Sequence, residues 1–271
     1  MKTIIGSLWR MAIAAVLVLA LSVSAEAAGA DWEAAVVRAD GYGLPGATAS
    51  PAQAELMARR AAIADAYRAL AEQTESVAVT SETTVRNLML ESDTVQTRVS
   101  AAIRGAKVVS GGWENGSYHV VVEMPIYGAG SLASAVLPET KTPEPLPAPT
   151  TKVSINVEIT KEAGAYTGLV VDCRGLGLSP AMSPVILNAN GQKIYGYKNL
   201  ESKKVIHSGM AGYAKDLAGA SRAGSRPLVV KAIRTENHGF NPVLSVADAD
   251  LVLTANQTAR FLENCSVVFL R

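Results

Sequence analysis

The sequence predicts an α+β protein in two folded parts, and three observations lead to that prediction. Prolines crowd residues 138–150, a stretch that can form neither a helix nor a central strand. Before this stretch, patterns of strand and helix period alternate, which predicts one sheet with two helices on one face. After it, shorter strands and helices alternate, which predicts an α/β sandwich with a mixed sheet. We therefore expect folded parts at 28–137 and 151–271, joined by a proline-rich linker.

The strongest single element is a helix at residues 50–73. Ser50 is a suitable N-cap, Pro51 suits the first helical position, and an alanine-rich run follows. A strand at 32–43 precedes this helix and closes in a glycine and proline turn at 43–46. The apolar stripe predicted to face the sheet consists of Leu56, Ile63, Tyr67 and Leu70.

The rest of the first part continues the alternation. Residues 76–85 alternate valines with small polar residues, which is typical of a half-buried strand. Residues 86–104 have a helical apolar period. Residues 106–128 read as a hairpin, because two β-branched runs flank the turn signal Asn115-Gly116.

The second part is expected to hold a buried central strand at 166–173, which is uniformly apolar. Another hairpin is predicted to turn at Asn190-Gly191. The remaining predicted elements are strands at 152–159, 227–235 and 265–270 and helices at 208–220 and 245–264.

The first 27 residues have the pattern of a signal peptide. Lys2 and Arg10 supply positive charge, Met11 to Leu21 is apolar, and Ala25-Glu26-Ala27 fits a cleavage site. The apolar run is shorter than the roughly 20 residues of a membrane-spanning helix. We expect an exported chain, located in the periplasm, at the outer membrane or at the cell surface. The alternative is an uncleaved N-terminal anchor.

Charge and composition argue against several classes of function. Cleavage after Ala27 leaves 23 basic and 23 acidic residues, so the mature chain has no net charge. Basic residues occur only as scattered pairs, whereas binding to nucleic acid needs a dense local excess of them. The three histidines form no metal-binding motif with each other or with the cysteines. We therefore expect no nucleic-acid partner, no metal and no cofactor.

The two cysteines, Cys173 and Cys265, leave two alternatives open. An exported location permits a disulfide between them, which would close a long loop. The other interpretation is that they are two small buried hydrophobic residues. Neither cysteine lies in a motif with a histidine, and the chain has no G-x-S-x-G sequence, so no catalytic residue is predicted.

The stretch VVDCRGLGLSP at 170–180 is the candidate ligand-binding site. A nucleotide loop needs a third glycine and a following helix, but Pro180 stands where that glycine would be. The interpretation that survives is a tight corner in which Gly175 and Gly177 adopt positive φ or permit close approach. Asp172 and Arg174 can hold a ligand at this strand end, or they can bond to neighbouring groups of the protein itself. We expect Arg174 to bond to the backbone.

Residues 40–135 resemble a family of bacterial envelope proteins typified by a small membrane-associated surface lipoprotein. The pattern comprises a G-x-G turn, the helix motif A-x-x-A-R-x-A-A-x-x-A-Y-R-x-L-A, an I-x-G-A strand and a Y-x-V-x-V-x-M-P strand. The N-terminal domain of the flagellar assembly protein T is similar. The second part resembles a domain often appended to such proteins, for which no activity is implied.

The resemblance implies an exported, non-enzymatic envelope protein that serves surface or flagellar assembly. Its expected partners are envelope or surface proteins, or a second copy of itself, reached through a sheet edge or a helix face. No cysteine lies near the cleavage site, so no direct lipid anchor is expected. The alternative function is a periplasmic module that recognises an envelope ligand near residues 172–180.

Overall fold

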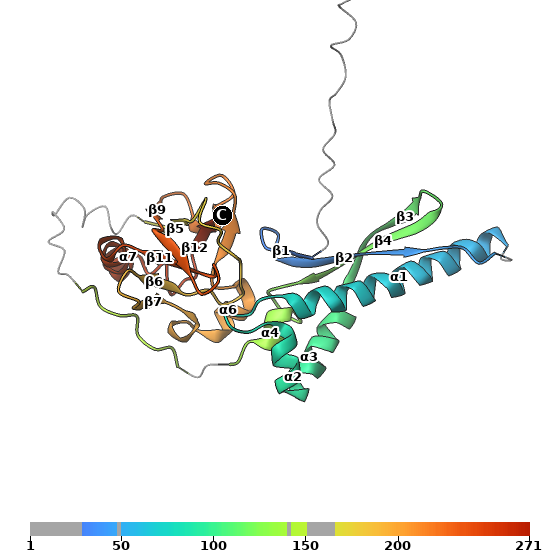
Figure 1. Ribbon diagram of the computed structural model, residues 1–271, viewed down its shortest axis with the longest axis horizontal. Helices are drawn as coiled ribbons and strands as arrows, with labels where there is room; N and C mark the ends of the chain where they lie inside the picture. The colour runs from blue at the N-terminus through green and yellow to red at the C-terminus, as the bar shows by residue number, and fades with distance from the viewer. Residues whose placement is uncertain (1–28, 48–49, 140–141, 151–165) are drawn as a thin grey trace, which may run out of the picture.

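The computed structural model describes residues 29–47, 50–139, 142–150 and 166–271, and it confirms the α+β class (Figure 1). The first part forms one antiparallel sheet with helices along one face. The second part carries two small sheets. The predicted strand at 152–159 lies outside the described residues.

The N-terminal sheet has four strands in the order β1-β2-β4-β3. The predicted hairpin is confirmed, since β3 and β4 pair in antiparallel register around Asn115 and Gly116, both at positive φ. In Figure 1 this hairpin projects away from the second part, beside the start of the long helix α1. The strands are β1 (Gly29–Asp31), β2 (Val36–Gly43), β3 (Lys107–Glu114) and β4 (Ser117–Pro125).

Helix α1 (Pro51–Ser76) lies directly on the backbone of β2. A Cβ atom added at Gly41 would lie 2.2 Å from the carbonyl oxygen of Ala62, and one at Gly43 would lie 1.9 Å from that of Ala58. The turn predicted at residues 43–46 was therefore wrong for its first residue, because Gly43 still belongs to β2. Both glycines belong to the strand, and their role is to let the helix approach.

The predicted apolar stripe on α1 was also partly wrong. Leu56 is 57% exposed, whereas the helix buries Ala58, Ala62 and Ala66 against the glycines of β2. Small residues occupy the contact because a helix seated on a glycine-bearing strand leaves no room for longer side chains. Leu70 is buried as expected, and Ile63 and Tyr67 pack at the margin of the core.

Residues 76–85 do not form the predicted strand. They make one isolated bridge, Ala78 to Thr84, and turn the chain from α1 into α2. The valines were a correct burial signal, since Val77 and Val79 are in the core. The single helix predicted at 86–104 is two helices, α2 (Val85–Glu91) and α3 (Asp93–Arg104), because Ser92 interrupts the run and accepts a hydrogen bond from the Val95 amide.

The second part is built around a four-stranded parallel sheet in the order β8-β12-β5-β9. The predicted central strand is β5, and the second predicted hairpin is formed by β6 and β7 with Gly191 at positive φ. The central strand and the hairpin belong to different sheets, because β6 and β7 form a second, mixed sheet with β10 and β11, in the order β10-β11-β6-β7. The strands are β5 (Gly168–Asp172), β6 (Ile186–Asn188), β7 (Lys193–Tyr195), β8 (Gly212–Ala214), β9 (Pro227–Lys231), β10 (Arg234–Glu236), β11 (Asn241–Leu244) and β12 (Val267–Leu270).

Residues 208–220 do not form the predicted helix. The chain forms α6 (Ser202–Ser208) before it, and Gly209 at positive φ ends that helix. Residues 212–214 then enter the parallel sheet as β8. The last predicted helix is confirmed as α7 (Val246–Ala259), capped by Ser245.

The two parts share contacts on several sides. The amides of Met182 and Ser183 donate to the carbonyls of Ala78 and Val79 at 3.0 and 2.8 Å. Near the short helix α4 (Leu132–Val136), the Gly128 amide donates to the carbonyl of Ile206. Buried residues of both parts belong to one hydrophobic cluster, so the core continues across the expected boundary.

The proline-rich stretch lies against the second part where it is described. The Glu144 amide donates to the carbonyl of Lys198, and Asn199 donates to the carbonyls of Glu144 and Pro145. At its end, Thr150 donates from both its amide and its hydroxyl to the buried carboxylate of Asp250. Residues 142–150 contain no helix or strand, as the prolines predict.

Candidate functional site

The candidate residues Asp172 and Arg174 bind each other. Arg174 donates from Nε to Oδ1 of Asp172 at 2.9 Å and from Nη2 to Oδ2 at 2.7 Å, and its backbone amide adds a bond of 3.1 Å to Oδ1. The expectation that Arg174 bonds to backbone carbonyls was therefore wrong. The bidentate pair satisfies both oxygens of the carboxylate and turns the arginine back along its own loop.

This pairing dominates the electrostatics of the corner. The hydrogen bond from Arg174 lowers the pKa of Asp172 to about 2, although partial burial of the carboxylate opposes the shift. Lys231, beside Asp172 in the register of β5 and β9, favours the charged carboxylate further. The acid is thus neutralised by two cations of the protein itself.

Gly175 and Gly177 form the corner at positive φ, with values of 78° and 65°. No atom lies within 4 Å of a Cβ added at either glycine, so backbone conformation and not close approach requires them. The turn is clamped by the neighbouring loop, because the Ser179 amide donates to the carbonyl of Gly239 and the Thr235 hydroxyl donates to that of Leu176. These bonds hold a rigid corner in place.

Cys173 and Cys265 are both buried and free, so the structure contains no disulfide between them. The register explains why. Asp172 pairs with Leu270 in the parallel neighbours β5 and β12, so Cys173 follows the end of one strand while Cys265 precedes the start of the other. The two Cα atoms are separated on the order of 20 Å along the strands, whereas a disulfide needs less than about 7 Å.

Burial also makes both thiols poor nucleophiles. It raises the pKa of Cys173 to about 12 and raises the pKa of Cys265 as well. The buried tyrosines of the second part are held in a similar way: Tyr195 donates to the carbonyl of Met210, and Tyr213 donates to that of Ala181. These polar groups therefore brace the core.

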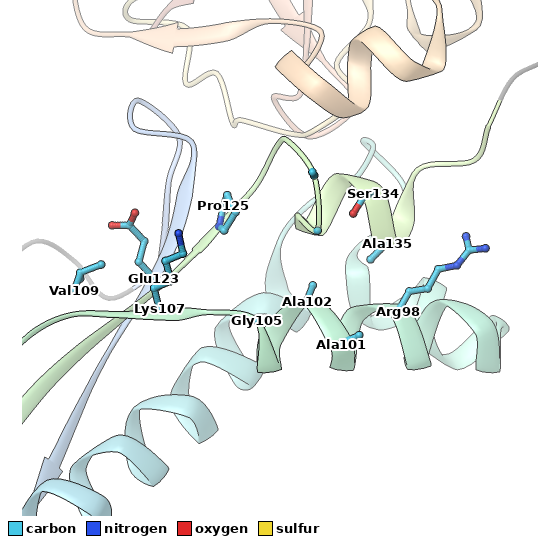
Figure 2. Close-up of a pocket in the computed structure, with 12 residues that line it drawn as sticks. Arg98, Ala101, Ala102, Gly105, Lys107, Val109, Glu123, Pro125, Ser134 and Ala135 are labelled. Carbon is cyan, nitrogen blue, oxygen red and sulfur yellow. The ribbon is translucent and has the colours of Figure 1, made fainter.

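The structure shows a cavity of about 720 Å³ in the first part, which the sequence did not indicate (Figure 2). It lies where α3 ends and β3 begins, between these elements, β4 and α4. Lys107 and Glu123 flank one side, and Ser134 points its hydroxyl from the other. Glu123 is engaged by Arg38 at 2.8 Å, and Arg98 extends away from the cavity in Figure 2. Small residues and backbone form most of the wall, which gives no convergent set of polar groups.

The most unusual surface is the projecting end of the first part, formed by the β3–β4 hairpin, the end of β2 and the start of α1. Every residue of β3 is exposed, and β3 is an edge strand. Large apolar side chains that are exposed along neighbouring elements are typical of an interaction surface. The exposed ones here are Tyr42, Leu44, Leu56, Met57, Val108, Val109 and Trp113.

A polar cluster braces this end on the face opposite α1. His119 of β4 contacts Asp40 of β2 through Nε2 at 2.7 Å and Glu114 of β3 through Nδ1 at 3.3 Å. The Tyr42 ring stacks on the imidazole with 4.7 Å between ring centroids. The cluster ties three strands together, so the hairpin stays ordered although little covers it. This cluster could not be predicted from the sequence, because Asp40, Glu114 and His119 lie on different strands and come together only in the folded sheet.

Two kinds of feature are absent from the described part of the chain. In residues 29–47, 50–139, 142–150 and 166–271, no group of three or more His, Cys, Asp or Glu side chains is placed to hold a metal ion. Among the helices of those same ranges, none combines the length and the apolar character that crossing a membrane requires.

Each part of the chain is similar to a known protein family. Residues 43–125 match the LPP20 lipoprotein family, and residues 168–271 match the second domain of Treponema pallidum Tp0624. No curated protein matches the chain. These two matches do not show the expected similarity to the flagellar assembly protein T. The first match runs from Gly43, at the end of β2, to the end of β4, so it includes the contact of Gly43 with Ala58 and the projecting hairpin, and the second spans β5 to β12. The two matches together support a two-part, bacterial lipoprotein-like protein of the cell envelope.

Proposed function

We propose that this chain is a non-enzymatic interaction module of the bacterial envelope, and that it binds a protein partner through the projecting end of its first part. The likeness to a lipoprotein family supports the envelope location. The observation that carries the binding role is β3, an edge strand exposed along all eight residues. Its unpaired peptide groups and exposed apolar side chains suit the addition of a strand from another chain.

The state of the candidate residues supports a role without catalysis. Asp172 and Arg174 neutralise each other, and the two thiols are buried with raised pKa values. At the corner 172–177 the two charged side chains bind each other, so we favour the projecting end as the binding surface. Assembly of the cell surface or of the flagellum is a narrower form of the same proposal.

Photo-crosslinking in intact cells tests the proposal. A photoreactive amino acid at Trp113, which is 49% exposed, should give discrete adducts with a protein when the cells are irradiated. The matched control is the same amino acid at Leu217, which is 54% exposed but lies in the second part. Adducts of equal yield from both positions, or from Leu217 alone, would contradict the proposal.

A further inference from the structure

The turn of the β3–β4 hairpin determines which peptide groups of β3 face outward. Asn115 and Gly116 have φ values of 49° and 83°, so a two-residue turn of the primed type joins Glu114 to Ser117. In such a hairpin the closing pair exchanges both hydrogen bonds, and successive residues then alternate. Glu114 and Gly112 therefore bond to β4, while the amide and carbonyl groups of Gly111 and Trp113 point away from the sheet.

These outward groups fit a second copy of the same strand. In an antiparallel pair related by a two-fold axis, each outward residue must face an outward residue. Gly111 of one copy then lies opposite Trp113 of the other, and the axis passes between the two Gly112 residues. The register places Ser110 opposite Glu114, so no like charges face each other.

The side chains of this register are complementary. Gly111 and Trp113 lie on the face that α1 covers, because their partners in β4 are Val120 and Tyr118. Each exposed indole would therefore lie over Gly111 of the other copy, next to the Tyr118 and Val120 side chains that flank this glycine, an arrangement that stabilises glycine in a sheet. Gly112, at the axis, has no atom within 4 Å of an added Cβ, so the two backbones can approach freely.

The extent of pairing is limited on both sides. A β-bulge between Val108 and Ser110 interrupts the strand, and the turn ends it after Glu114. Five residues of each copy can therefore pair. So short an interface is at the small end for a specific complex, which predicts a weak dimer with a Kd above about 1 µM.

We propose that two copies of this chain associate through β3 in this antiparallel register and form a continuous eight-stranded sheet. The inference rests on the proposed function, since it identifies the partner of the projecting end as a second copy. A weak contact of this kind becomes significant where the protein is concentrated, because association then follows mass action.

Cysteine crosslinking tests the register directly. Gly112 meets its own copy as a pair without mutual hydrogen bonds, for which Cα atoms lie about 4.5 Å apart, a separation that a disulfide can span. The variant Gly112→Cys should therefore form a disulfide-linked dimer under mild oxidation. Ser110→Cys is the matched control, because the two Ser110 residues lie about 13 Å apart along the strands. The native thiols are buried and do not compete.

A charge exchange at the axis supplies a second test. Gly112→Lys and Gly112→Glu each add a side chain that the free chain accommodates, but each places like charges face to face in the dimer. Each variant alone should be monomeric by sedimentation at concentrations where the unmodified chain dimerises. An equal mixture of the two should restore the dimer.

The inference is overturned if Gly112→Cys crosslinks no more than Ser110→Cys, or if the mixture of charged variants stays monomeric. The photo-crosslinking at Trp113 separates this failure from that of the proposed function. Adducts with another protein, without crosslinking through residue 112, would leave the binding surface in place and remove the second copy as its occupant.

Discussion

The projecting end of the first part and the parallel sheet of the second part differ in how far their strands are covered. At the projecting end, a helix rests on glycines through alanines, the sheet has little cover, and charged and polar side chains brace its open face. In the second part, the centre of the parallel sheet is enclosed, with all four residues of β12 buried and Phe269 fully covered, and Tyr195 of the mixed sheet is fully covered as well. Seven large apolar side chains are exposed at the projecting end, against three in residues 166–271.

This difference shows which residues serve the fold in each part. The apolar side chains of the buried strands pack inside the second part, so their role is to stabilise the fold. The projecting end leaves apolar side chains and the edge of β3 exposed, and this is the surface that we propose binds a partner. Substitutions in the two regions should therefore differ in kind as well as in size.

The largest difference is expected in the reactivity of the thiols. In the folded chain Cys173 and Cys265 should react with a thiol reagent at least about a thousandfold more slowly than in denaturant, because exposure requires opening of the core. Mass spectrometry after labelling counts the reacted thiols. Two labels should appear in denaturant without any reductant, and a chain that takes none there would contain the disulfide that the structure excludes.

Truncation of one aromatic side chain in each region should give the next largest contrast. Phe269→Ala leaves a cavity in the enclosed core and should lower the free energy of unfolding by about 3–5 kcal/mol. Trp113→Ala removes an exposed ring that contacts Tyr118 at 5.6 Å, and should cost about 1 kcal/mol or less. Urea unfolding measures both, at low protein concentration so that association does not contribute. Equal losses would contradict the contrast.

Two glycines of the first part should differ although each receives the same methyl group. Gly41→Ala drives a Cβ against backbone atoms of Ala62 and Ala66, so α1 must move off β2, at a cost of about 2–3 kcal/mol. Gly112→Ala meets no atom within 4 Å and should change the free energy of unfolding by less than about 0.5 kcal/mol. The measurement is again urea unfolding. A harmless Gly41→Ala would show that α1 is not seated on β2 as closely as described.

These glycines also show how far the sequence can predict the fold. Period and turn signals correctly predicted α1, both hairpins, the central strand β5 and α7, because each of these follows from local pattern. Gly41 and Gly43 looked like a turn, since a glycine that admits a neighbouring helix has the same letter as one that adopts positive φ. Residues 76–85 had the alternation of a strand, but their carbonyls at Ala78 and Val79 pair with the second part, which no local pattern reveals.

The candidate corner illustrates a second limit. The spacing of glycine and proline predicted a tight corner with either positive φ or close approach at Gly175 and Gly177, and the structure has positive φ at both. Whether Arg174 faces a ligand depends on its rotamer, and it turns to Asp172 two residues earlier. The projecting end, by contrast, gave no sequence signal as a surface, because exposure of Leu56 and Trp113 follows from which face α1 presents and from the position of β3 at the sheet edge.

The smallest predicted effect concerns the pair Asp172–Arg174 and its dependence on pH. The unfolded carboxyl binds a proton near its ordinary pKa of 3.8, whereas the folded one resists protonation until about pH 2, so the pair stabilises the folded chain above 3.8 and that contribution is lost as the pH falls toward 2. Arg174 is 52% exposed, so solvent and salt weaken the pair. Arg174→Met should therefore be slightly less stable than the unmodified chain at neutral pH, and the two urea-unfolding curves should converge in acid. A difference that grows in acid, or that persists unchanged at high salt, would mean that Arg174 stabilises the corner through packing of its stem and not through its charge.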